Sequence, residues 1–241
     1  MTLEVIVNME TTAFFSLLDE RVQRYDLLTH PFYKAWTVGE LTREDLRVYA
    51  EDYYPQVEAF PGYLALLGVR LEESELRRAV FANMADENGG DNRLGAWERA
   101  HGELWLDFVE GMGGSRAPKP KMMAEVAELV SKFQSIASES TPEEALAAFY
   151  AYESQVPRVA RAKERGLRDM YAADEKTRAY FALHAVADVH HSQVWRKQLG
   201  ERVAANPGSA EPALDAAEKV AQALWKVLDG IESRRLERVT A

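Results

Sequence analysis

Metal-ligating residue types recur at helical spacing in residues 180–195. At about 100° per residue, His184, Asp188 and His191 project from one helix face within a sector of about 60°, and His190 points away from it. The Ala, Leu and Val residues around them indicate a buried face, where three polar groups would each need a partner. One metal ion serves all three, so the stretch predicts a metal site. A polar or pH-sensitive helix face is the alternative.

Other helical segments offer further candidate ligands. Glu153 interrupts an apolar face between Phe149 and Val156, Glu87 closes one segment, and His101 opens another. Each has an ordinary alternative, a surface acid for Glu153 and a first-turn histidine for His101. Helical bundles hold metals between facing helices, with acids and histidines drawn from several of them. The pattern therefore predicts ligands from more than one helix.

The nature of these candidates indicates which metal they would bind. They are three carboxylates and three imidazoles: Glu87, His101, Glu153, His184, Asp188 and His191. Six ligands exceed the four of a tetrahedral zinc site and suit two divalent ions with open positions. Oxygen and imidazole ligands without sulfur favour iron or manganese. The chain has no cysteine, which excludes disulfides, zinc fingers, iron–sulfur clusters and thiol nucleophiles.

The elements that must position these residues are helical throughout. Periodic apolar residues and cap signals predict helices over residues 10–28, a segment from Thr42 through Phe60, and residues 74–88, 98–112, 119–136, 141–165, 174–200 and 212–236. No alternating strand pattern, internal repeat or long linker interrupts them. We therefore expect one all-α domain over residues 1–241, a bundle of seven or eight helices.

Local signals set the expected ends of several helices. Thr42 and Thr141 are hydroxyl N-caps followed by acids, and at Thr141 a capping box with Glu144 is predicted. Pro55 and Pro61 are expected to bend the helix that contains them. Glycines are expected to end the 141–165 and 174–200 helices, at positions 166 and 200.

Composition excludes several classes of partner. The 241 residues are 47% hydrophobic and carry 39 acids against 29 bases, a net charge of −10. That balance disfavours nucleic acid and anionic membrane surfaces, both of which attract basic proteins. No apolar run reaches the ~18–20 residues of a membrane span. The first residues lack the basic region of a secretory signal, so we expect a cytoplasmic protein.

Several stretches together resemble the haem-oxygenase-like di-metal oxidases, most closely the group of the chlamydial protein associating with death domains. The resemblance spans about residues 28–200 and rests on residues 30–36 (HPFYKAW), 39–42 (GELT), 49–54 (YAEDYY), 59–64 (AFPGYL), 150–157 (YAYESQVP) and 187–191 (ADVHH). It implies the seven-helix fold shared with the TenA thiaminases and the PqqC oxidases, with a family-like core at about 10–200 and an added helix at 212–236. It also implies the same six ligands. One departure is a 14-residue separation of Glu87 and His101, longer by a segment (Asp91 to Glu98), which makes His101 the least secure of them.

The resemblance further implies an activity. Relatives of this type form p-aminobenzoate for folate synthesis: dioxygen is activated at an Fe/Fe or Mn/Fe pair, with a reductant, and a tyrosine of the protein itself is cleaved. The matching tyrosine is Tyr33, the lysine proposed as amino donor matches Lys163, and two further tyrosines match Tyr152 and Tyr180. Spacing alone places Lys163 about 15 Å along a helix from Glu153. Without the resemblance, Tyr33 would be a core aromatic packed against its neighbours.

Two other functions remain open from the sequence. One is a di-metal oxidase of the same fold acting on an external small molecule, such as a fatty acid or amino acid. The other is a non-enzymatic helical bundle that binds a protein partner, with a structural or vestigial metal site. A homodimer is common for this fold, by analogy only. Metal content, and the effect of changing Tyr33 to phenylalanine, distinguish these hypotheses.

Overall fold

The computed structural model describes residues 3–72, 74–89, 99–117, 119 and 121–240, with side chains described from 11 to 238 within those ranges. Over them the chain forms helices and no strand, so the predicted all-α bundle is confirmed. In chain order the elements are α1 (Leu3–Gln23), η1 (Leu27–Thr29), α2 (Pro31–Val38), α3 (Arg43–Arg70), α4 (Glu75–Glu87), α5 (His101–Gly111), α6 (Ala124–Glu139), α7 (Pro142–Glu153), α8 (Val156–Asp169), α9 (Glu175–Ala205), η2 (Pro207–Ser209) and α10 (Ala210–Thr240).

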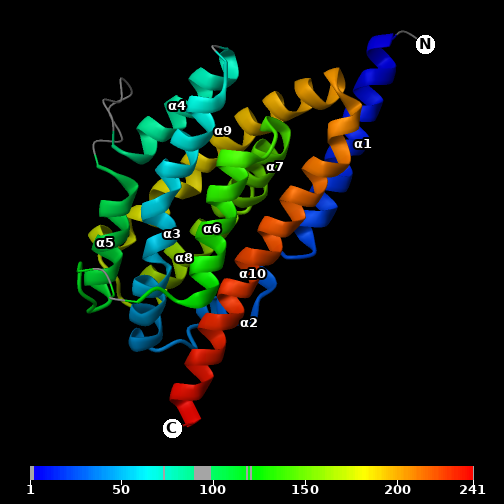
Figure 1. The fold of residues 1–241 in the computed structure, drawn as a ribbon. Coiled ribbons are helices and arrows are strands. Elements are labelled where there is room, and N and C mark those ends of the chain that lie inside the picture. Colours follow the sequence, from blue (N-terminus) through cyan, green and yellow to red (C-terminus); the bar gives the residue numbers. More distant parts are fainter. Residues whose placement is uncertain (1–2, 73, 90–98, 118, 120, 241) are drawn as a thin grey trace.

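Two long helices organise the bundle (Figure 1). The α9 helix packs against α5, α7 and α8, and α3 packs against α4, α5 and α6. The α10 helix covers α6 and α7 and lies beside α1, where Arg21 pairs with Glu211 and Asp215. The space enclosed by α3, α4, α5, α7 and α9 is where the candidate ligands meet.

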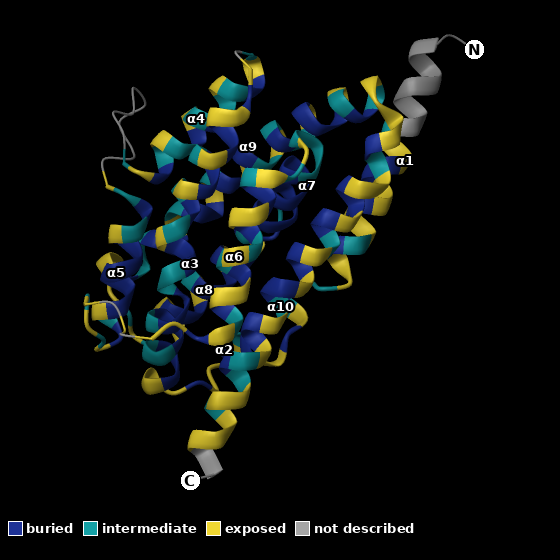
Figure 2. Cartoon of the chain, viewed as in Figure 1, coloured by how far each residue is buried: buried dark blue, intermediate teal, exposed yellow. Residues whose placement is uncertain are grey.

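Burial follows the pattern of amphipathic helices (Figure 2). Buried faces turn inward and exposed positions lie on the outer faces, notably toward the end of α10. The largest fully buried side chains are aromatic and include Trp36, Trp105 and Trp195. Burying one large apolar side chain contributes roughly 1.5–3 kcal/mol, so this aromatic core is a main source of rigidity around the site.

The hydroxyl caps form as the sequence predicts. Thr42 and Thr141 each accept a backbone hydrogen bond from the third helical residue, and Asp45 and Glu144 complete reciprocal capping boxes. The helix that begins after Thr42 continues through Pro55 and Pro61 to Arg70, well beyond Phe60.

The predicted 141–165 helix is wrong in one respect, because it is two helices. Pro157 has no N–H to donate to the Glu153 carbonyl, so α7 ends at Glu153 and α8 begins at Val156. Gln155 stabilises the break: its Nε2 donates to the Ala151 carbonyl and its Oε1 accepts from the Leu27 N–H. The break puts Glu153 at a helix end and redirects the chain toward α2.

Two glycines expected to end helices lie inside them instead. α8 continues past Gly166 to Asp169, and α9 continues past Gly200 to Ala205. A Cβ at Gly166 would lie 2.8 Å from Trp36 Cδ1, and one at Gly200 would lie 3.2 Å from Phe15 Cε2. These glycines permit close helix packing rather than termination.

Other boundaries differ by less. The 10–28 helix ends at Gln23 and is followed by η1, and α2 is an element that the sequence did not predict. The α6 helix begins at Ala124 rather than at Lys119, whose Nζ instead binds Asp52 Oδ1 at 2.6 Å. The fourth predicted helix begins at His101, and the longer segment from Asp91 to Glu98 lies outside the described residues.

Among the described helices, none is long and apolar enough to cross a membrane.

Candidate metal centre and tyrosine–lysine pair

Four helices bring the predicted ligands into the core. All six are buried. Glu87 comes from α4, His101 from α5 and Glu153 from α7, and α9 supplies His184, Asp188 and His191. Donor atoms lie within 4.8 Å of one another in two sets, Glu87 with His101 and His184, and Glu87 with Asp188 and His191. Glu87 belongs to both sets, so its carboxylate adjoins both groups of candidate ligands. His190 is exposed, in line with its exclusion from the ligand set.

The first set is tightly drawn together. His101 Nδ1 lies 2.7 Å from Glu87 Oε2, and the His101 and His184 ring centroids are 4.5 Å apart. Burial opposes ionisation of Glu87, but the adjacent His101 outweighs it and lowers the pKa of Glu87. His184 Nδ1 donates to the Tyr180 carbonyl at 2.9 Å, so its Nε2 carries the lone pair. A backbone acceptor of this kind is the usual support of a metal-binding histidine.

The second set carries an imidazole between two acids. His191 Nδ1 lies 3.4 Å from Asp188 Oδ1, and its Nε2 lies 3.3 Å from Asp86 Oδ2. Burial acts to lower the pKa of His191, but hydrogen bonds to Asp188 and Asp86 outweigh it and raise the pKa to about 11. The site thus favours positive charge at this position, which a divalent ion supplies when it replaces the proton.

Glu153 stands slightly apart from both sets. Its Oε1 accepts from Asn83 Nδ2 at 3.1 Å, and its Oε2 accepts a close hydrogen bond from Trp195 Nε1. Burial raises the pKa of Glu153 to about 8, with Asp188 adding to this effect and His191 opposing it. With Glu87, His184 and Asp188, Glu153 lines a small cavity at the centre of the cluster.

The donor set fits a pair of divalent ions. Three carboxylates and three imidazoles are buried in an aromatic core, where charged groups are costly unless they are paired or bind a metal. The oxygen and nitrogen donors of the two sets match iron or manganese coordination. The residues present are therefore suited to a two-metal site.

A second group of polar side chains lies beside this cluster. Lys163 Nζ donates to Tyr33 Oη at 2.7 Å and to Tyr49 Oη at 2.5 Å, and the two phenol oxygens are 3.1 Å apart. Burial lowers the pKa of Lys163 well below its ordinary value, and burial raises the pKa of Tyr33 and Tyr49. This environment favours a neutral amine in contact with neutral phenols.

Two tyrosines lie between the candidate ligands and the group of Tyr33, Tyr49 and Lys163. Tyr152 and Tyr180 line the cavity of the metal ligands and also the cavity that contains Tyr33 and Lys163. The Tyr180 ring stacks on His184 with centroids 3.9 Å apart. The two tyrosines therefore form the partition between the ligand cluster and the tyrosine–lysine pair.

The structure brings together all ten predicted site residues, including Tyr33 and Lys163, which spacing alone did not place near the ligands. Sequence reasoning missed the roles of Tyr49, Asn83, Asp86 and Trp195 as partners of these residues. A usable signal existed for two of them: Asn83 lies one turn before Glu87, and Trp195 one turn after His191.

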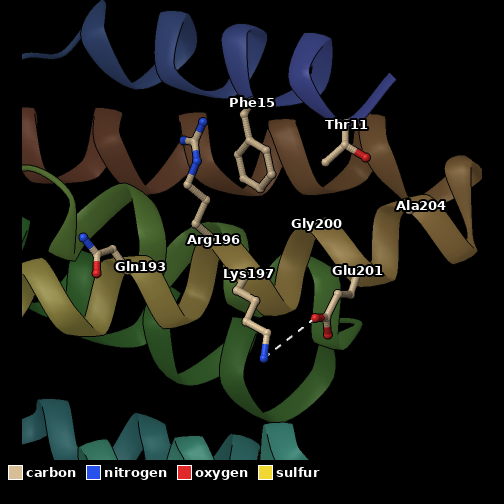
Figure 3. A pocket seen from close by; sticks show the side chains of 8 residues that line it. All are labelled: Thr11, Phe15, Gln193, Arg196, Lys197, Gly200, Glu201 and Ala204. Carbon is tan, nitrogen blue, oxygen red and sulfur yellow. Dashed lines mark ion pairs between the residues drawn. The ribbon is translucent and has the colours of Figure 1, made fainter. Parts of the chain in front are cut away.

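A wider groove of about 500 Å³ lies elsewhere, between α1 and α9 (Figure 3). Thr11 and Phe15 line one side, and Arg196, Lys197 and Glu201 the other. It shares no residue with the cavities of the candidate centre.

Comparison with known proteins identifies the family and the fold of the chain. The profile of a family described as iron-containing redox enzymes matches residues 47–225. The chain is 36% identical to a 4-aminobenzoate synthase of Nitrosomonas europaea, covering 92% of each chain, and 35% identical to one of Chlamydia trachomatis, covering 94% and 93%. Two solved structures share the fold. A TenA homologue from Pseudomonas syringae has a TM-score of 0.74 and 16% identity, and the match covers 92% of this chain and 93% of that one. A domain of unknown function with a haem-oxygenase-like fold from Shewanella denitrificans has a TM-score of 0.71 and 15% identity, and the match covers 100% of this chain and 97% of that one. This chain belongs to the haem-oxygenase-like family of iron-containing redox enzymes.

Proposed function

We propose that this enzyme forms 4-aminobenzoate from its own Tyr33, with Lys163 supplying the amino nitrogen and the six buried ligands holding two divalent ions. Relatives that align over more than nine-tenths of the chain are 4-aminobenzoate synthases. The observation that carries the proposal is the 2.7 Å contact between Lys163 Nζ and Tyr33 Oη beside the ligand cluster.

The chemistry of the product explains why this contact matters. 4-Aminobenzoate carries its nitrogen para to its carboxylate, and a tyrosine ring carries its oxygen para to Cβ. Conversion therefore requires nitrogen at the ring carbon that bears the hydroxyl, and Lys163 Nζ lies at that end of Tyr33. Cβ of Tyr33 would become the carboxylate carbon, with dioxygen as the oxidant and the Cα–Cβ bond cleaved. The phenol oxygen would leave as water, and cleavage of the Nζ–Cε bond of Lys163 would leave its nitrogen on the ring.

The protein environment prepares the reacting groups. A protonated lysine has no lone pair to form a bond, and burial lowers the pKa of Lys163 well below its ordinary value, which favours the neutral amine. The Lys163 and Tyr49 contacts fix the orientation of the Tyr33 hydroxyl. Tyr33 is only 4% exposed, so bulk water has little access to the reacting ring.

The two ions, when bound, supply activation of dioxygen with electrons from a reductant. Glu87, His101 and His184 would hold one ion, and Glu87, Asp188 and His191 the other, with Glu153 adjoining. Tyr152 and Tyr180 would separate this centre from Tyr33 while remaining in contact with both cavities. Iron in both positions and a manganese–iron pair are the metal contents we propose.

Isotope labelling tests the proposal directly. Protein containing ¹³C-labelled tyrosine and ¹⁵N-labelled lysine is loaded with iron or with manganese and iron, then exposed to dioxygen and a reductant. We expect 4-aminobenzoate with a labelled ring and labelled nitrogen, in no more than about one equivalent per chain. Unlabelled product would refute the origin in Tyr33.

A matched pair of variants distinguishes the other functions. Tyr33→Phe should keep its metal and lose the product, whereas Tyr25→Phe, at a partly buried tyrosine that packs on Trp225, should change neither. Many turnovers on an added small molecule in the Tyr33→Phe variant would favour an external substrate. A parent protein that takes up no metal during loading, and consumes no dioxygen afterwards, would favour an interaction protein.

A further inference from the structure

Glu153 differs from the other candidate ligands in what holds it. One carboxylate oxygen accepts from Asn83 Nδ2 at 3.1 Å, and the other accepts from Trp195 Nε1. The other five candidate ligands fall into the two donor sets within 4.8 Å, but Glu153 belongs to neither set. Its carboxylate is therefore held by hydrogen bonds from two residues outside the set of candidate ligands.

Both donors are built into helices that already carry ligands. Asn83 precedes Glu87 by four residues on α4, and Trp195 follows His191 by four residues on α9, so each lies on its ligand's face. Asn83 is 3% exposed and Trp195 is fully buried. Hydrogen bonds from buried donors to a carboxylate are strong and directional, because water does not compete for them.

The surroundings of Glu153 indicate which ion it would serve. Trp195, the donor to Glu153 Oε2, lies one turn after His191 on α9 but about three turns after His184. His101 and His184 form the opposite set, with Glu87 between the two. Glu153 thus lies on the Asp188–His191 side of the centre.

We propose that Asn83 and Trp195 are positioning residues that hold the Glu153 carboxylate for the ion on the Asp188–His191 side, and that they do not support the ion on the His101–His184 side. This inference rests on the two-metal centre of the proposed function. Residues outside the ligand set that orient a ligand typically contribute 10–100-fold to metal affinity. The two ions should therefore respond differently when these donors are removed.

Two conservative variants remove the donors while keeping the space filled. Trp195→Phe keeps an aromatic ring against Phe149, whose centroid lies 5.9 Å away, and removes the indole N–H. Asn83→Leu keeps the approximate side-chain volume and removes the amide. Trp225→Phe is the matched control, because Trp225 packs on Tyr25 and His30, away from the ligands.

In the experiment, chelator-treated full-length protein is titrated with Mn²⁺ alone. Binding is measured by calorimetry and by the electron paramagnetic resonance signal of free Mn²⁺. We expect the parent and Trp225→Phe to bind two ions per chain. In Trp195→Phe and in Asn83→Leu, one ion should bind as in the parent and the other 10–100-fold more weakly. The double variant should bind only one ion over the same concentration range.

The selectivity of the loss separates positioning from general damage to the fold. Loss of both affinities together, or two unchanged affinities in both variants, would overturn the positioning role. If the parent makes labelled product and binds two ions while the variants match it, only this inference fails. A parent that binds fewer than two ions overturns the two-metal centre as well.

Discussion

Lys163→Met should make the protein more stable at neutral pH, and its advantage should shrink as the pH rises. Lys163 is 6% exposed, and its Nζ contacts two phenol oxygens and, within the described part of the chain, no carboxylate. Burial lowers the pKa of Lys163 well below its ordinary value in the folded protein, so the folded state binds a proton there less readily than the unfolded state does. Folding of the parent therefore releases up to one proton from this side chain.

The size of the effect follows from that proton. An unfolded lysine has a pKa of about 10.4, so deprotonating it costs about 4.6 kcal/mol at pH 7 and about 1.9 kcal/mol at pH 9. Methionine avoids this cost but leaves Tyr33 and Tyr49 without the amine, a loss of roughly 1–3 kcal/mol that does not depend on pH. The advantage of the variant should thus be at most about 2–4 kcal/mol at pH 7, the limit for a fully deprotonated amine in the folded protein, and close to zero at pH 9.

The sign is set by proton counting. Between pH 7 and 9 the unfolded parent binds up to one more proton at residue 163 than the folded parent does, so parent stability rises with pH relative to the variant. The slope of the difference is at most about 1.4 kcal/mol per pH unit, whatever the hydrogen bonds contribute.

Urea unfolding of both metal-free proteins at half-unit steps from pH 7 to 9 measures this slope. Lys34→Met is the matched control, because Lys34 is exposed on the same helix as Tyr33 and is in water in both states. Its stability relative to the parent should not vary over this range. A constant difference between Lys163→Met and the parent would refute the argument, because it would mean that Lys163 keeps its proton in the folded protein.

Three further substitutions test other parts of the structure. His184→Ala should remove at least one of two bound ions per chain, measured by elemental analysis, whereas the exposed His190→Ala should keep both. Thr141→Ala should lower the free energy of unfolding by about 1 kcal/mol through loss of the capping box, and no change in urea unfolding would show that the cap is dispensable. Gly166→Ala should lower it by about 1–3 kcal/mol because the new Cβ lies 2.8 Å from Trp36 Cδ1; an unchanged midpoint would mean that α2 and α8 separate freely.

The sequence predicts where the candidate ligands lie because these residues follow local rules. His184, Asp188 and His191 share a face through helical periodicity alone, and the apolar neighbours of Glu153 indicate its burial. The capping boxes at Thr42 and Thr141 are equally local, since each depends on residues three apart. Such features require no knowledge of the tertiary structure.

What the sequence alone could not predict depends on contacts between distant segments. Tyr33 meets Lys163 across 130 residues, and the spacing of Lys163 from Glu153 along a straight helix hides this, because the chain turns between α7 and α8. Gly166 resembles a helix terminator until Trp36 of a separate helix occupies the space beside it. The short α2 helix has too few residues to show a clear periodicity, yet it carries Tyr33.

The arrangement around Lys163 is hard to explain by stability alone. An aliphatic residue would fill the same space without releasing a proton on folding, and a carboxylate beside Lys163 would have stabilised its charge. The structure instead surrounds the amine with Tyr33, Tyr49, Trp36 and Phe181. Proteins tolerate such a cost where activity depends on it. An amino donor needs a free lone pair on nitrogen. The weak proton binding of the buried amine lowers the stability of the fold at pH 7, and the same property would make Lys163 reactive toward Tyr33.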